Sequence, residues 1–197
     1  MINPEIKVGQ WLNVRHNKGW TWKLIRHVLG SWGDHNAPIL ERYGELVIGD
    51  AKPGGAETTT LEKYQDEIDK GEIEVRVYDI PFVSFPERHW ASAWWLNNVD
   101  GSPYDYMAFP RLILKALFGD WIPAAAGWEW AWWCTESCRD MYIEPRQITR
   151  EIDPLGNENP TPRTVENRVA SGDLIFVADK LILAGADIQC DDQEVVK

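Results

Sequence analysis

The sequence predicts an α+β domain, in which short strands and helices of one chain pack around a shared core. Segments such as residues 73–78 alternate apolar and polar side chains, which is typical of half-buried strands. Other segments repeat apolar residues at intervals of three and four, as amphipathic helices do. With 197 residues, 44% of them apolar and 26% charged, the chain is long enough for one well-filled core and has the composition of a globular protein.

The first third of the chain alternates strands and helices. Apolar residues one turn apart predict a helix over residues 20–29, with Gly30 just past its end. Short extended segments are expected at three places: 10–14, 36–40 and 45–51. The last two are predicted to pair as neighbours through a tight turn at Tyr43 and Gly44.

The same alternation continues through the rest of the chain. Ser84 begins the best-marked helix, because Pro86 follows in the first turn and Glu87 stands three residues after the serine, as in a capping box. Helices are expected over four ranges: 60–70, 84–98, 111–118 and 133–142. Strands are expected over two: 73–78 and 174–178. We predict one domain over residues 1–185, followed by an acidic C-terminal tail over residues 186–197.

The charge of the chain narrows the classes of partner. There are 20 Lys and Arg against 31 Asp and Glu, so the net charge is −11, which argues against a nucleic-acid partner. No apolar run approaches the roughly 18 residues of a membrane span. The first residues lack the pattern of a secretory signal, and three cysteines, an odd number, predict reduced thiols. We therefore expect a cytoplasmic protein, with a phage-encoded or virion-associated protein as the alternative.

Cys134 is the candidate nucleophile. It opens the segment CTESCRDMY, and a cysteine in the first turn of a helix meets the positive end of the helix dipole. That field favours the thiolate, which is the reactive form of the side chain. The alternative is that Cys134 is an ordinary core residue, as we expect Cys138 to be. The two cysteines have no second pair of ligands, so no metal site is predicted, and Cys190 falls in the acidic tail.

A cysteine nucleophile needs a base, and His35 is the candidate. Of the other three histidines, His27 and His89 fall inside predicted helices and His16 falls in a polar loop, RHNKG. His35 follows a Gly–Asp turn at the start of a predicted strand, which can hold the ring in place while it points toward a helix N-terminus. Position alone does not separate this role from a structural one.

Asp50 is the candidate for a third residue, which would orient the imidazole of His35 through its other ring nitrogen. It belongs to the segment LVIGDAKPGG, in a strand expected to lie beside the one that His35 begins. The alternative is that Asp50 forms the turn before Pro53. The spacing of these residues leaves both readings open.

The order of these residues resembles that of the circularly permuted, papain-like cysteine peptidases of the NlpC type, which include YiiX-like and lecithin-retinol-acyltransferase-like proteins. In that family a histidine on a strand comes first, a polar residue on the next strand follows, and the cysteine at a helix start comes last. Five segments carry the resemblance, over roughly residues 7–179: WKLIRHVLGSWGDHNAPIL, ELVIGDAKPGGAETTTLEKY, GSPYDYMAF, WWCTESCRDMY and TPRTVENRVASGDLIFVAD.

The resemblance implies a permuted papain-like fold, with a small antiparallel sheet packed with helices and no cofactor. It places Cys134 as the nucleophile, His35 as the base and Asp50 at the polar position, where other polar residue types often occur in the family. Three further residues are expected at or beside the substrate: Tyr104, Asp105 and Glu136. Each also has a structural reading, since the first two fit a turn and a glutamate in the first helical turn complements the helix dipole.

Twelve tryptophans form the unusual part of the composition, and most of them follow residue 89. Trp90 and Trp94 are one turn apart and are expected to face the core, whereas Trp128, Trp130 and Trp132 alternate along the approach to Cys134. Aromatic rings beside a cleft can also stack on a substrate, which is the alternative reading.

The predicted function is that of a thiol hydrolase that cleaves an amide or peptide bond, such as one in a cell-wall peptide, through an acyl-enzyme. The expected partner is the peptide or amide substrate, and the oligomeric state stays open. Two alternatives remain at this point. One is a non-enzymatic binding or structural module on the same fold, and the other is an acyltransferase or thioesterase that acts on lipid.

Overall fold

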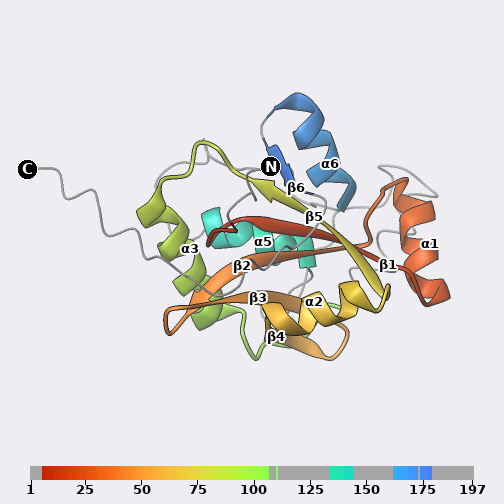
Figure 1. Ribbon diagram of the computed structural model, residues 1–197, viewed down its shortest axis with the longest axis horizontal. Coiled ribbons are helices and arrows are strands. Elements are labelled where there is room, and N and C mark those ends of the chain that lie inside the picture. The colour runs from red at the N-terminus through yellow and green to blue at the C-terminus, as the bar shows by residue number, and fades with distance from the viewer. Residues whose placement is uncertain (1–5, 107–109, 111–133, 144–161, 173, 179–197) are drawn as a thin grey trace, which may run out of the picture.

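The computed structural model describes residues 6–106, 110, 134–143, 162–172 and 174–178. In these residues the chain forms a six-stranded antiparallel sheet and five helices (Figure 1), which confirms the predicted α+β class. The strands are β1 (Trp11–His16), β2 (His35–Arg42), β3 (Glu45–Lys52), β4 (Gly55–Thr60), β5 (Ile73–Asp79) and β6 (Ile175–Ala178). The helices are α1 (Trp20–Leu29), α2 (Leu61–Asp69), α3 (Phe85–Asn98), α5 (Cys134–Ile143) and α6 (Pro162–Ser171).

The predicted elements within this part of the chain agree with the structure to within two residues at either end. Four features of the sequence lie outside the described residues: the expected helix at 111–118, the alternating tryptophans at 128–132, Cys190 and the tail at 186–197. Among the described helices, none is both long and apolar enough to cross a membrane.

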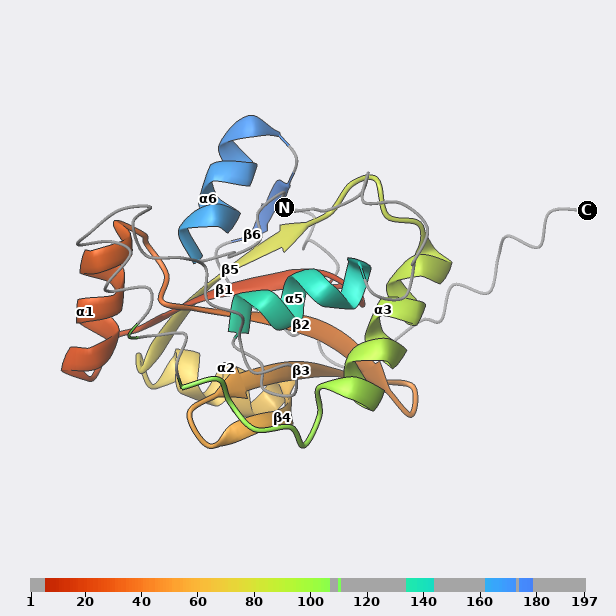
Figure 2. The same cartoon turned by 180° about the vertical axis from the view of Figure 1, so that it is seen from behind.

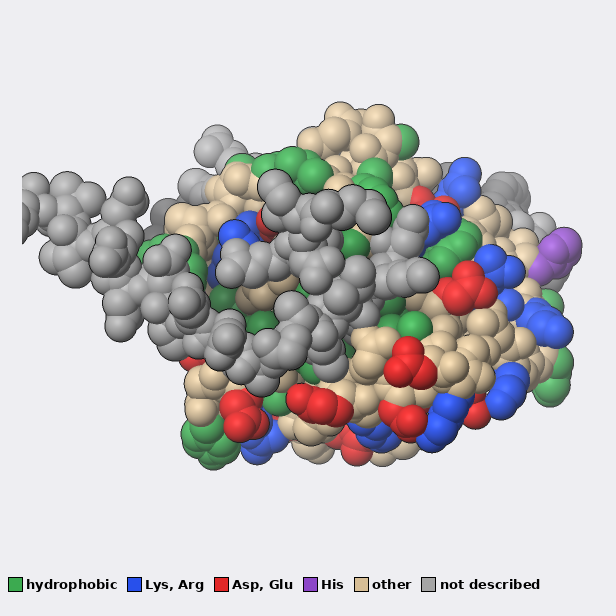
Figure 3. Space-filling model, in the orientation of Figure 1, with side chains coloured by type: hydrophobic (Ala, Val, Ile, Leu, Met, Phe, Trp, Pro, Cys, Tyr) green, Lys and Arg blue, Asp and Glu red, His purple; other side chains and the backbone are tan. Residues whose placement is uncertain are grey.

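The sheet separates two hydrophobic cores. Its strand order, β4–β3–β2–β1–β5–β6, puts β2 and β1 at the centre. Because successive side chains of a strand point to opposite faces, Ile39 and Ile48 pack with α2, whereas Leu40 and Val47 belong to the core of α3 and α5. The two opposite views show α2 on one face of the sheet and α5 on the other (Figures 1 and 2). On the face that carries α2, acidic and basic side chains are interspersed (Figure 3).

The hairpin of β2 and β3 confirms the predicted turn. Tyr43 and Gly44 have φ angles of 56° and 83°, which is the left-handed backbone of a tight two-residue turn. A second hairpin, from β3 to β4, is not predicted by the sequence analysis. The residues of β4, GAETTT, are mostly polar because this strand forms the edge of the sheet, so they lack the alternation that marks a half-buried strand.

Helix α3 corrects the expectation for the tryptophans. The capping box is confirmed, since the backbone N–H of Ser84 donates to Glu87 at 2.7 Å. Trp90, however, is 64% exposed, and the ring that fills the core is Trp95, which is completely buried. The expected pairing of Trp90 with Trp94 in the core is therefore wrong for Trp90, because the buried stripe of α3 runs through Ala91 and Trp95 instead.

Gly49 makes room for Trp95 on the sheet. A Cβ atom at Gly49 would lie 2.8 Å from Cδ1 of Leu40 and 2.9 Å from the indole of Trp95, closer than carbon atoms normally approach. We expect Gly49→Ala to lower the free energy of unfolding by about 1–3 kcal/mol, as overpacking of a filled core does. Urea denaturation checks this value, and the same substitution is measured both in the wild-type protein and in a protein that carries Trp95→Phe. The smaller ring should reduce the cost of the alanine, and an equal cost in both backgrounds would contradict this explanation.

Candidate active site

His35 and Asp50 are brought together by the two central hairpin strands. The register pairs Ile39 of β2 with Ile48 of β3, so His35 and Asp50 fall on the same face of the sheet as these two residues. The Nε2–H group of His35 donates to Oδ1 of Asp50 at 2.7 Å, and both side chains are buried. The predicted proximity of these two residues is therefore present in the structure.

The carboxylate of Asp50 is held by more than one donor. Its Oδ2 accepts from Nζ of Lys52 at 2.9 Å, and the same ammonium contacts Glu57 at 2.9 Å. The hydroxyl of Tyr64 also interacts with Asp50. Burial alone would raise the pKa of Asp50, but the hydrogen bond and charge of His35, followed by Lys52, hold this pKa well below its usual range. Asp50 therefore stays ionised and fixes the ring of His35.

Cys134 begins α5 and is 4% exposed. Burial would raise the pKa of its thiol, but the charge and hydrogen bond of His35 lower it, together with the backbone N–H of Asn36 and the hydroxyl of Thr135. Sγ of Cys134 lies 3.7 Å from Oγ1 of Thr135. That hydroxyl in turn accepts from Nδ2 of Asn36 at 2.8 Å, which ties the start of α5 to β2.

In the pair of Cys134 and His35, the proton therefore resides on His35. Burial lowers the pKa of His35, but the charge of Cys134 and the hydrogen bond to Asp50 outweigh it and raise the pKa from 6.5 to about 10. Since Nε2 is bound to Asp50, Nδ1 is the ring nitrogen left for the thiol. An imidazolium beside a thiolate is the arrangement that makes a cysteine nucleophilic near neutral pH.

The three residues predicted to border the substrate have different surroundings. Tyr104 is half-buried, and its pKa is raised by burial and then by the charges of Cys134 and Asp105, so it lies in the electrostatic neighbourhood of the thiol. Asp105 is buried. Glu136 lies half-buried in the first turn of α5. Cys138 is completely buried, as expected for a core residue, and burial raises the pKa of its thiol.

His16 is the site residue that the sequence analysis missed. It is the last residue of β1, opposite Ile73 of β5, and not part of a polar loop. The strand continues past Val14, so the alternation of apolar residues at positions 12 and 14 extends to His16 and turns its side chain to the face of His35. The two imidazole centroids are 6.2 Å apart. Following that alternation two residues further would have identified it.

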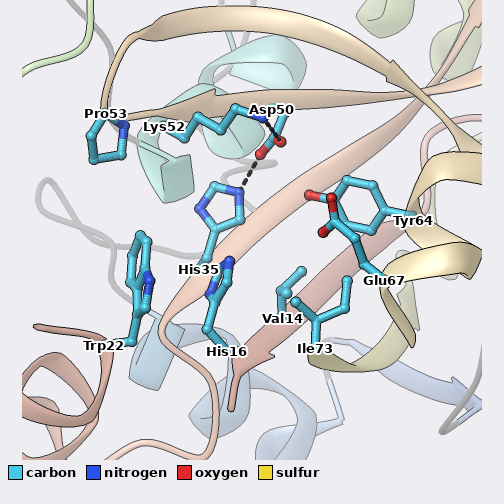
Figure 4. Close-up of a pocket in the computed structure, with 10 residues that line it drawn as sticks. All are labelled: Val14, His16, Trp22, His35, Asp50, Lys52, Pro53, Tyr64, Glu67 and Ile73. Atoms are coloured by element: carbon cyan, nitrogen blue, oxygen red, sulfur yellow. Dashed lines mark hydrogen bonds and ion pairs between the residues drawn. The ribbon is translucent and has the colours of Figure 1, made fainter. Parts of the chain in front are cut away.

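A cavity of about 270 Å³ opens beside His35. Figure 4 shows His16 and Trp22 on one side of the ring of His35 and Tyr64 and Glu67 on the other, with Asp50 above it. Cys134 is not among the residues that line this cavity, and neither are Tyr104, Asp105 and Glu136. His35 therefore lines the cavity, whereas the thiol of Cys134 lies outside it.

These features define an α+β protein with a buried Cys–His–Asp cluster between a helix start and the central strands of an antiparallel sheet. In its fold the chain is similar to YiiX of Escherichia coli O157:H7, a solved structure described as a metalloprotein of DUF1105. The two align with a TM-score of 0.60 and 15% identity, over 89% of this chain and 98% of YiiX. No protein-family model matches the sequence, and the comparison with curated proteins finds no match.

The residues that the structure describes do not fit a metal centre of the kind that the description of YiiX suggests for that protein. Among the side chains that the structure describes, no group of three or more His, Cys, Asp or Glu could hold a metal ion. The two histidines of this region are each paired with a carboxylate: His35 with Asp50, and His16 with Asp34. The chemistry proposed below therefore uses the thiol and the imidazole.

Proposed function

We propose that this protein is a thiol hydrolase in which Cys134 attacks a carbonyl carbon and His35 transfers the proton. The observation that carries the proposal is the Cys134–His35–Asp50 cluster, in which one carboxylate orients the imidazole and the imidazole lowers the pKa of the thiol. The likeness in fold to YiiX and the chain order His35, Asp50, Cys134 support a permuted papain-like architecture. The substrate that we propose is an amide or peptide.

The reaction has two stages, and His35 acts in both. In the first, the thiolate of Cys134 forms a bond to the carbonyl carbon, the C–N bond breaks, and the imidazolium gives its proton to the leaving amine. In the second, neutral His35 takes a proton from water, the resulting hydroxide attacks the acyl carbon, and the C–S bond breaks. The backbone N–H of Cys134, at the start of α5, is the proposed donor to the oxyanion.

Selective alkylation of Cys134 tests the proposal without a known substrate. At about pH 6, which is well below the ordinary thiol pKa of roughly 8.5, iodoacetamide should modify Cys134 faster than Cys190 or a model thiol. Cys138 should stay unmodified because it is completely buried and its pKa is raised. Mass spectrometry of the digested protein reads the rate at each cysteine.

The outcome separates the enzyme from its alternatives. If Cys190 reacts first and Cys134 follows the rate of a model thiol, the cluster does not activate the thiol and the hydrolase proposal fails in favour of a binding or structural module. If Cys134 reacts first, product analysis with acyl amides and with lipid esters follows. Release of a free acid and amine supports the hydrolase, whereas transfer of the acyl group to a second lipid identifies an acyltransferase.

A further inference from the structure

The cavity beside His35 contains groups that the proposed reaction does not use. His16 and Trp22 form one wall, where the two rings stack with centroids 4.2 Å apart and an angle of 12° between their planes. Glu67 reaches the cavity from α2 on the opposite side (Figure 4). None of the three takes part in the pairing of Cys134, His35 and Asp50, so their arrangement needs a separate explanation.

His16 is held so that one particular nitrogen is available. Its Nδ1–H donates to Oδ1 of Asp34 at 2.5 Å, and its backbone N–H donates to Oδ2 of the same carboxylate at 3.1 Å. The guanidinium of Arg26 also binds Asp34, whose side chain is completely buried. A neutral histidine that donates from Nδ1 has its lone pair on Nε2, so His16 contributes a hydrogen-bond acceptor to the wall of the cavity.

Glu67 contributes the charge. Its side chain is half-buried, and no described residue forms a salt bridge with it. The ammonium in the same cavity, that of Lys52, is already bound by Asp50 and Glu57. His35, the other cationic group that lines the cavity, is likewise paired with Asp50. The groups left for a ligand are therefore a carboxylate, an imidazole acceptor and an indole ring, a set that suits a positively charged hydrogen-bond donor.

We propose that this cavity is a binding subsite for a positively charged substrate group, such as a primary amine, which Glu67, His16 and Trp22 recognise next to His35. This proposal rests on the proposed function, because the bound group belongs to a substrate only if the protein is an enzyme. It adds the charge of that substrate to the proposed function. Binding itself does not depend on the chemistry of Cys134. In the bound state the ammonium pairs with Glu67 and donates to Nε2 of His16, while the indole of Trp22 contacts its carbon atoms.

A titration with three small probes tests the subsite directly. Benzylamine, benzyl alcohol and benzoate have the same ring, but at pH 7 they carry a positive charge, no charge and a negative charge. The indole N–H resonance of Trp22, assigned through Trp22→Phe, reports occupancy in a ¹H–¹⁵N spectrum of the full chain. Benzylamine should bind at least about fivefold more tightly than either of the other probes, as expected for one partly solvated ion pair.

Variants on α2 separate a local contact from the overall charge. Glu67→Gln should weaken the binding of benzylamine by about fivefold, whereas Glu62→Gln, an equal change of charge at an exposed position of the same helix, should change it by less than about twofold. His16→Leu, which removes the acceptor, should also weaken binding. The dispersion of the spectrum shows whether each variant is folded.

The results distinguish this inference from the proposed function. Cys134→Ala should bind benzylamine as the wild-type protein does, so the subsite stands even if Cys134 proves unreactive. Equal affinities for benzylamine and benzoate would overturn the inference while leaving the hydrolase proposal intact. So would equal effects of Glu67→Gln and Glu62→Gln, because the preference would then reflect the general negative charge of the chain.

Discussion

Replacing His35 with alanine should slow the alkylation of Cys134 at pH 6 by about 10- to 100-fold. The charge and hydrogen bond of His35 lower the pKa of Cys134 against the opposing effect of burial, so without the imidazole the thiol pKa rises. A thiol with a pKa of roughly 8.5 is only about 0.3% ionised at pH 6. The loss of thiolate is partly offset because a more basic thiolate is a better nucleophile, which gives the stated range.

His27→Ala is the matched control for this measurement. His27 is an exposed histidine of α1, so its removal changes the same residue type away from the site. It should leave the rate at Cys134 unchanged, and the rate in His35→Ala should increase with pH as for an ordinary thiol. Equal rates in the two variants would show that His35 does not activate Cys134.

Several features of the site could be predicted from the sequence because they depend on local patterns. His35 and Asp50 lie in consecutive strands joined by a tight turn at Tyr43 and Gly44, so short-range signals are enough to put them side by side. Cys134 at the start of a helix follows from the same kind of reasoning. Its position beside His35 does not, since 98 residues lie between them, and only the family resemblance suggested that contact.

The features that the sequence did not reveal depend on tertiary contacts. Helical spacing alone does not show whether Trp90 or Trp95 of α3 faces the core. Trp95 does so because Gly49 of β3, which has no side chain, leaves space for its indole ring. The hydrogen bond of Asn36 with Thr135 likewise joins residues far apart in the chain. β4 was missed because an edge strand needs few apolar residues, so its pairing with β3 rather than its composition defines it.

The buried cluster around Asp50 has a structural cost that sequence patterns do not show. Asp50 accepts hydrogen bonds from His35 and Lys52 within a buried setting, so its removal takes one of the two negative charges from beside the imidazolium and one carboxylate from Lys52. Breaking a buried ion pair by deleting one partner costs about 3–5 kcal/mol. We therefore expect Asp50→Ala to lower the free energy of unfolding by about this amount at pH 7, as measured by urea denaturation.

The pH dependence of the free energy of unfolding tests whether the charge of Asp50 causes this loss of stability. The folded state holds the pKa of Asp50 below its ordinary value of 3.8, so its contribution to stability is present above that pH and is lost as the pH falls further. The raised pKa of His35 acts in the opposite direction: its contribution is complete below pH 6.5 and is lost as the pH rises through about 10. The difference in stability between wild type and Asp50→Asn should therefore be largest between pH 3.8 and pH 6.5 and should decrease as the pH rises toward about 10.

Two further variants complete this test. The first is a stability control, and the second decides whether Asp50 acts on His35 or only supports the fold. Asp66→Asn removes a carboxylate from an exposed pair with Lys70 and should leave the stability unchanged, because solvent screens that pair. Asp50→Asn keeps an oxygen acceptor for His35 but lacks the negative charge, so a folded Asp50→Asn protein should alkylate Cys134 more slowly at pH 6 than wild type does. If this variant reacts at the wild-type rate while losing stability, Asp50 is a structural residue, and Cys134 and His35 form the reactive pair without it.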